Sequence, residues 1–173
     1  MPNPGPGPRY DALLQLLRTA EALWNASRVF FARWDLSPSQ FNILNLLRHR
    51  SGGSTQTELS RELIMHRSNL TGLVDRLEKR GLVVRHSDPT DRRVHQVAIT
   101  PSGRKLVMKI LPFYYVEAEQ VWGNISAARA GQLIAELGHL AENAARLSAE
   151  PSPSMAARRR AERKSGAKKE SDP

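Results

Sequence analysis

Apolar positions recur with a helical period along most of the chain. Over residues 10–32 they return every three or four positions, which predicts a first long helix. A strong helix start follows, because Ser37 can cap, Pro38 suits the first helical position and Gln40 can complete a capping box. We expect this second helix to end at the serine and glycines of residues 51–53.

Two shorter helices come next. Thr55 and Glu58 form a second capping-box pattern and predict a short helix. The helix after it ends at Gly81, a residue suited to a left-handed C-cap. Its inward stripe is spaced i, i+3, i+4 and i+7, and consists of Leu70, Leu73, Val74 and Leu77.

The apolar period then changes from helical to alternating. Residues 82–86 and 96–100 read as two strands, joined by a polar, turn-forming segment at 87–93. A helix–turn–helix followed by a β-hairpin is the winged-helix arrangement. The predicted fold is therefore mainly α with a small β-hairpin wing: a winged helix-turn-helix flanked by long terminal dimerisation helices. The first of these helices begins near residue 10, the next near residue 101, and the last at Ser126.

Composition sets the expected boundaries of the folded part. Residues 1–8 contain four prolines and two glycines and predict a disordered leader, while residues 150–173 carry 7 basic and 4 acidic residues and predict a disordered basic tail. Residues 9–149 are expected to form a single unit. Within it the DNA-binding lobe spans 36–106, and the dimerisation helices span 9–35 and 107–149.

Charge and residue types exclude several classes of function. The 173 residues carry a net charge of +9, which favours a polyanionic partner such as nucleic acid. The absence of cysteine removes disulfides, thiolate zinc sites and cysteine nucleophiles, and the scattered histidines predict no metal site. We find no phosphate-binding loop, nucleophile elbow or acid–base pair, so we expect no enzyme and no cofactor. Without a membrane span or a secretory signal, a cytoplasmic protein is expected.

The outward face of the helix before Gly81 is rich in hydrogen-bond donors. Such side chains have the size and chemistry to meet base edges in a major groove. Asp75 also lies there, and we expect it to pair with Arg76, Arg80 or a wing arginine because a carboxylate repels phosphates. The predicted contact residues of this recognition helix are Arg67, Ser68, Asn69, Thr71, Gly72, Arg76 and Lys79.

The hairpin supplies a second predicted contact. Arg92 and Arg93 lie at its tip, where they can reach a phosphate or a narrow minor groove, and Asp91 can hold an arginine in a fixed direction. Arg85 on the first wing strand can touch the DNA backbone. Taken by itself, the helix pattern also fits an ordinary surface helix. The two arginines by themselves also fit a solvated loop without a binding role. The whole order of capping box, two helices, glycine and arginine-tipped hairpin favours DNA binding.

These segments resemble the MarR (multiple-antibiotic-resistance regulator) family of winged-helix transcription factors. The specific part of the resemblance consists of LTGLVDRLEKRGLVVR at 70–85, DPTDRR at 88–93 and VAITPSGRKL at 97–106, and LSPSQFNILNLL at 36–47 resembles the family's second helix. The resemblance implies an obligate homodimer, a pseudo-palindromic DNA site and release from DNA by a small effector. It places the family's wing Asp-x-Arg on Asp91 and Arg93.

The terminal helices predict the homodimer on physical grounds as well. A helix of about 23 residues is about 35 Å long, so a compact lobe cannot cover its whole apolar face. Packing against a second copy covers it and sets two recognition helices about 34 Å apart. The alternative is that the two terminal helices cover each other within one chain. The predicted dimerisation residues are Leu13, Leu17, Leu133, Leu137, Leu140 and Leu147.

Aromatic residues gather near the joint of the first two helices. Together with a cation they can line a pocket for an aromatic or phenolic acid, although aromatic residues at this spacing also fit a plain core. The predicted effector-pocket residues are Trp24, Arg28, Phe31, Trp34 and Phe41. The predicted function is a homodimeric, sequence-specific, double-stranded DNA-binding repressor that responds to a small effector. The alternative is a winged-helix protein-interaction module.

Overall fold

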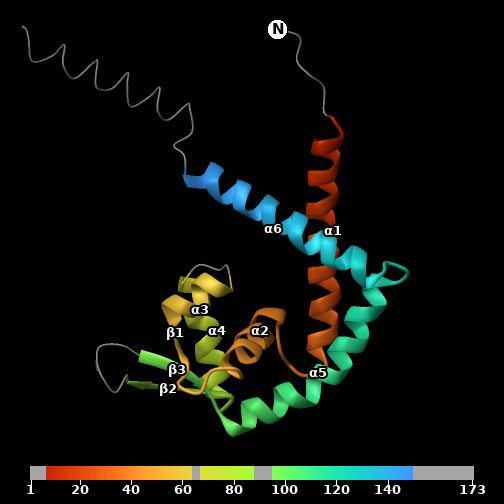
Figure 1. Cartoon of the computed structure of the whole chain (residues 1–173). Coiled ribbons are helices and arrows are strands. Elements are labelled where there is room, and N and C mark those ends of the chain that lie inside the picture. The colour runs from red at the N-terminus through yellow and green to blue at the C-terminus, as the bar shows by residue number, and fades with distance from the viewer. Residues whose placement is uncertain (1–6, 64–66, 88–94, 150–173) are drawn as a thin grey trace, which may run out of the picture. The chain divides into compact units, whose positions relative to one another are not determined.

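Six helices and three short strands make up the part of the chain that the computed structural model describes, residues 7–63, 67–87 and 95–149 (Figure 1). This confirms a mainly helical protein with a small sheet. The elements in chain order are α1 (Pro8–Ala32), α2 (Pro38–Leu47), β1 (Ser54–Thr55), α3 (Gln56–Glu62), α4 (Arg67–Lys79), β2 (Val83–Ser87), β3 (His95–Ile99), α5 (Pro101–Trp122) and α6 (Ala127–Ala149).

The helix starts follow the capping residues in the sequence. Ser37 and Gln40 form a complete capping box at α2, each side chain bonding the other's backbone N–H. Thr55 and Glu58 do the same at α3. The hydroxyl of Thr100 accepts from the third residue of α5 at 3.0 Å. These side chains satisfy backbone N–H groups that have no partner within their helices.

Three antiparallel strands form the sheet in the order β1-β3-β2. The hairpin pairs Val83 with Ile99 and Ser87 with His95. The third strand, β1, pairs Ser54 with Val97 and was not predicted. Two residues are too short to show an alternating pattern, so only the tertiary contact with β3 makes this segment a strand.

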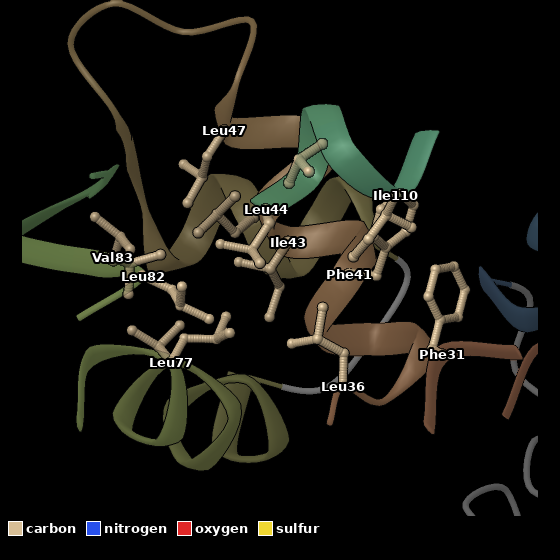
Figure 2. Close-up of a cluster of buried hydrophobic side chains, with 14 of the residues drawn as sticks. Phe31, Leu36, Phe41, Ile43, Leu44, Leu47, Leu77, Leu82, Val83 and Ile110 are labelled. Carbon is tan, nitrogen blue, oxygen red and sulfur yellow. The ribbon is translucent and has the colours of Figure 1, made fainter. Parts of the chain in front are cut away.

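Among the described residues, a cluster of buried side chains joins α1 to α5 with the two hairpin strands (Figure 2). Leu44 and Leu47 of α2, Leu77 of α4 and Ile110 of α5 are all completely buried. Val83 brings the first wing strand into the same cluster. The core therefore fixes α4 and the base of the hairpin on one scaffold.

Two predicted helix boundaries differ in the structure: α2 ends at Leu47, before residues 51–53, and α1 begins at Pro8 rather than near residue 10. Pro8, assigned to the leader, is the first residue of α1, because a proline fits the first helical turn where its missing N–H has no role. Residues 1–6 and the tail at 150–173 lie outside the described residues. The chain divides into two compact units, Met1–Ala118 and Glu119–Pro173, with the boundary inside α5. The arrangement of residues 9–149 as one functional unit stays a prediction.

Candidate nucleic-acid interface

Helix α4 buries one face and exposes the other. Leu70, Val74 and Leu77 are fully buried, as their spacing predicts. On the opposite side the donor residues Asn69, Thr71, Arg76 and Lys79 are exposed, and Gly72 is half-exposed. A helix with an exposed donor-rich face of this kind is the element that enters the major groove in helix-turn-helix proteins. Arg67 and Ser68 open α4, but their side chains lie outside the described residues.

A pair of carboxylates on α4 holds the first wing strand. Asp75 accepts a hydrogen bond from Nη2 of Arg85 at 2.6 Å, and Glu78 accepts from Nη1 of the same guanidinium. Glu78 also accepts from the backbone N–H of Arg85 at 3.0 Å. Asp75 thus pairs with a wing arginine, as expected for a carboxylate that must not face phosphates. We call these three residues the wing brace.

The electrostatics of the wing brace centre on Arg85. Partial burial works against its charge, but the hydrogen bonds and charges of Asp75 and Glu78 outweigh that and raise the pKa of Arg85. The side chain of Arg85 is 24% exposed, and its charge is paired with two carboxylates. In the structure the charge of Arg85 joins β2 to α4. The expectation that Arg85 touches the DNA backbone stays a prediction.

The tip of the wing falls outside the described residues. Asp91, Arg92 and Arg93 belong to residues 88–94, so their predicted contacts stay predictions. The described strands end at Ser87 and His95, which are paired with each other.

A side chain from α3 reaches the outward face of α4. The hydroxyl of Thr71 donates to Oε1 of Gln56 at 3.0 Å, across 15 positions of sequence. Gln56 was not among the predicted contact residues. The sequence feature that could have pointed to Gln56 was its position directly after Thr55, the residue that caps α3.

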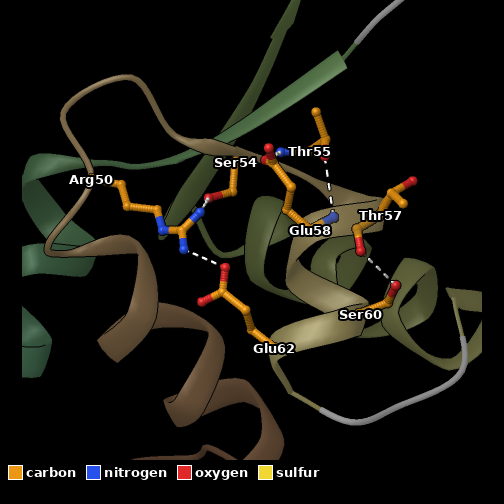
Figure 3. Close-up of polar contacts among 7 residues, drawn as sticks. All are labelled: Arg50, Ser54, Thr55, Thr57, Glu58, Ser60 and Glu62. Carbon is orange, nitrogen blue, oxygen red and sulfur yellow. Dashed lines mark hydrogen bonds and ion pairs between the residues drawn. The ribbon is translucent and has the colours of Figure 1, made fainter.

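Further polar contacts fix α3 and β1 beside it (Figure 3). Arg50 donates to the hydroxyl of the buried Ser54 at 2.8 Å and forms an ion pair with Glu62. The hydrogen bonds from Thr55 lower the pKa of Glu58. These contacts hold the start of α3, and therefore Gln56, in place.

The C-terminal end of α4 is tied to the turn between α1 and α2. Arg80 donates to the backbone oxygens of Trp34 and Asp35 and pairs with the carboxylate of Asp35 at 3.6 Å. Asp35 has a φ of 53°, a left-handed conformation that aspartate tolerates better than most residues. Arg80 thus anchors the end of α4 to a sharply turned segment.

The aromatic residues at this joint divide into core and surface. Phe31 and Phe41 are 1% and 0% exposed, and their rings stack with centroids 4.4 Å apart. Their burial favours the core interpretation for these two. Trp34 is half-buried, under the Nζ of Lys109 at 5.4 Å, and Trp24 is exposed.

An open cleft of about 350 Å³ lies next to this aromatic core. Arg28 is the one predicted pocket residue that lines it; the other lining residues are Ala32, Asp35, Leu36, Ser37, Pro38 and Gln40. The cleft is therefore lined by one cation, Arg28, one carboxylate, Asp35, and one hydroxyl group, Ser37.

The terminal helices expose large apolar side chains. On α1, Leu13 and Leu17 are 52% and 60% exposed. On α6, Leu140 and Leu147 are 51% and 74% exposed, with Leu133 at 37% and Leu137 half-buried. Leucines exposed at helical spacing are typical of surfaces that a partner covers.

The described residues also lack the features of a metal site and of a membrane-spanning helix. No group of three or more histidine, aspartate or glutamate side chains is placed to hold a metal ion there. No helix in these ranges combines the length and the apolar character that crossing a lipid bilayer requires.

Comparisons with known proteins agree with this geometry. A family model described as "MarR family" matches residues 34–94. The regulator MhqR of Bacillus subtilis (strain 168) is 33% identical over 86 residues, 50% of this chain and 59% of its own length. The regulator FarR of Neisseria gonorrhoeae is 30% identical over 128 residues, 72% of this chain and 87% of its own.

Solved structures share the fold. CouR of Rhodococcus jostii RHA1, crystallised with p-coumaroyl-CoA, is 27% identical with a TM-score of 0.70, covering 76% of this chain and 92% of CouR. The matches thus include the helix pair, the hairpin and, with FarR and CouR, most of the flanking chain. By these shared features the chain belongs to the MarR family of winged-helix transcriptional regulators.

Proposed function

We propose that this protein is a homodimeric, sequence-specific, double-stranded DNA-binding repressor with a pseudo-palindromic site. The observation that carries the proposal is the exposed, donor-rich face of α4, whose opposite face is locked into the core by Leu70, Val74 and Leu77. Among the side chains described on that face, Asn69 and Thr71 have the size to read base edges, and Arg76 and Lys79 carry charge toward phosphates.

The wing brace supports a second contact. The ion pairs of Arg85 with Asp75 and Glu78 join the first wing strand to α4. Arg92 and Arg93 follow β2 in the sequence, and we infer that they contact the DNA beside the groove that α4 enters. Their charge is expected to add affinity by releasing counterions from the DNA.

The homodimer is supported by the exposed leucines of α1 and α6. A second copy of the chain that covers these side chains would remove apolar surface from water. Two-fold symmetry would then place two copies of the exposed α4 face in one dimer. Two such surfaces about 34 Å apart face the same side of the duplex, so the bound site is expected to be palindromic.

The deciding experiment selects bound duplexes from a random pool at 0.15 M salt, a value near physiological ionic strength. We expect a palindromic consensus for the wild type. Asn69→Ala should relax one base position in each half-site, whereas Arg93→Ala and Lys79→Ala should weaken all duplexes alike and reduce the salt slope by about one each. A wild type that enriches no duplex would contradict the proposal and favour the protein-interaction module.

The effector proposal rests on the cleft that Arg28 lines. We propose that it receives the carboxylate of a small aromatic acid, an idea supported by the similarity to CouR, which was crystallised with p-coumaroyl-CoA. Binding is tested by titrating tryptophan fluorescence with aromatic carboxylates, with Arg28→Gln as the matched variant. A saturable change that Arg28→Gln weakens, together with release of bound DNA, supports the proposal. No saturable change with the wild type would contradict it.

A further inference from the structure

Gln56 is attached to the α4 surface by one hydrogen bond. Its Oε1 accepts from the hydroxyl of the exposed Thr71 at 3.0 Å, while its own side chain is half-buried at the start of α3. The bond brings a side chain from the first helix of the pair to the edge of the face that is proposed to enter the groove.

The bond also fixes the direction of the carboxamide. A carboxamide oxygen only accepts, so the Thr71 hydroxyl is the donor and the amide nitrogen of Gln56 points away from it. No acceptor among the described residues receives a hydrogen bond from that nitrogen. Oε1 keeps a second lone pair as well. Gln56 therefore offers two N–H donors and one acceptor site in a fixed orientation.

We propose that Gln56 is a further specificity-determining residue that reads an A·T base pair in the major groove. A glutamine carboxamide matches adenine, since its nitrogen donates to N7 while its oxygen accepts from the N6 amino group. Thr71 acts as a positioning residue, because its hydroxyl holds the amide in the orientation that this pairing needs. The proposal rests on the proposed DNA binding and names one base contact within it.

The rest of the local structure supports a fixed amide. The capping box of Thr55 and Glu58 sets the start of α3, one residue before Gln56. Arg50 braces the other end of that helix through Glu62 and holds β1 through Ser54 (Figure 3). A side chain that is already ordered loses less entropy on binding, so its contact discriminates more sharply between bases.

The test compares base preferences of three variants with those of the wild type. We expect Gln56→Met to reduce discrimination at one A·T position per half-site by about tenfold and to leave the other positions unchanged. Thr71→Val, which keeps the shape but removes the hydroxyl, should blur the same position. The matched control is Gln15→Met, because Gln15 also bonds a threonine, Thr19 on the exposed side of α1, at 3.4 Å. It should change no base preference.

A second measurement probes the contacted atom and needs no protein variant. Replacing the adenine at that position with 7-deazaadenine removes the N7 acceptor, and we expect wild-type affinity to fall about tenfold. Gln56→Met should be indifferent to this replacement.

The possible results separate the two proposals. An unchanged base profile for Gln56→Met, or uniform weakening at all positions, would overturn the role of Gln56, as would full wild-type affinity for the 7-deazaadenine duplex. Failure of the wild type to enrich any sequence would instead overturn the proposed function.

Discussion

The carbonyl oxygen of Leu82 faces Gly103 across the junction between the wing and α5. A Cβ on Gly103 would lie 2.1 Å from that oxygen and 2.9 Å from Cγ1 of Ile99. The same carbonyl accepts from the backbone N–H of Thr100 at 3.1 Å, so it cannot move away without losing a hydrogen bond. The start of α5 is thus packed directly on the base of the hairpin.

Gly103→Ala should destabilise the protein by about 2 kcal/mol or more, because the added methyl group meets backbone rather than a side chain that can rotate. Urea unfolding at fixed protein concentration measures this. The matched control is Gly131→Ala on α6, where a Cβ meets nothing within 4 Å. That change should be neutral or stabilise by up to about 1 kcal/mol, since alanine favours a helix over glycine. Equal effects of the two substitutions would contradict the packing argument.

Arg85→Ala should lower the free energy of unfolding by about 1 kcal/mol, because it leaves Asp75 and Glu78 without their shared cation in a partly buried place. It should also weaken DNA binding, since the wing is released and two carboxylates then face the phosphates. Arg33→Ala is the control: it breaks a pair with Glu117 whose side chains are 57% and 46% exposed, and should have little effect on either measurement. Undiminished DNA affinity of Arg85→Ala would argue against the brace.

The capping box at α3 should make stability depend on pH. The hydrogen bonds from Thr55 lower the pKa of Glu58, so ionised Glu58 stabilises the fold above the pKa it has in the unfolded chain. That stability is lost as pH falls through the lower pKa of the folded state. Glu58→Gln should therefore cost more at pH 7 than in acid. Urea unfolding at pH 7 and at acidic pH measures the free-energy cost of the substitution under each condition. The control is Glu136→Gln on an exposed part of α6, whose cost should not depend on pH in this way.

Thr55→Ala removes the other half of the same capping box. It should destabilise the protein by about 1 kcal/mol at pH 7, the usual cost of losing a helix N-cap. Because Gln56 follows this cap directly, the variant should also blur the base position assigned to Gln56. A melting temperature and a base profile that both match the wild type would contradict the role given to this helix start.

Leu17→Glu should convert the proposed homodimer to a monomer and greatly weaken binding to a palindromic duplex. It places a charge on the apolar face of α1 that a second copy is proposed to cover. Sedimentation velocity and DNA titration measure the two effects. Ala22→Glu introduces the same side chain at an exposed position on the other side of the helix and should leave the dimer intact. A wild type that sediments as a monomer would contradict the dimer itself.

Local patterns along the chain were enough to predict much of the fold. Ser37 with Gln40 and Thr55 with Glu58 predicted helix starts because capping depends on residues only three positions apart. The stripe that includes Leu70 and Leu77 predicted the inward face of α4, since a helix repeats every 3.6 residues whatever surrounds it. Short-range geometry of this kind can be read without knowing the tertiary structure.

Pairings between distant residues had to come from the structure. The sequence offered Arg76, Arg80 or a wing arginine as partners for Asp75, and the packing of β2 beside α4 decided for Arg85. Likewise, only the meeting of α3 and α4 brings Gln56 to Thr71, 15 positions away. The sequence by itself thus determined which helices form and which face of α4 is polar, because periodicity and capping are local. Tertiary structure decided which of those polar groups are bound internally and which remain exposed, because that depends on contacts between elements far apart in the chain.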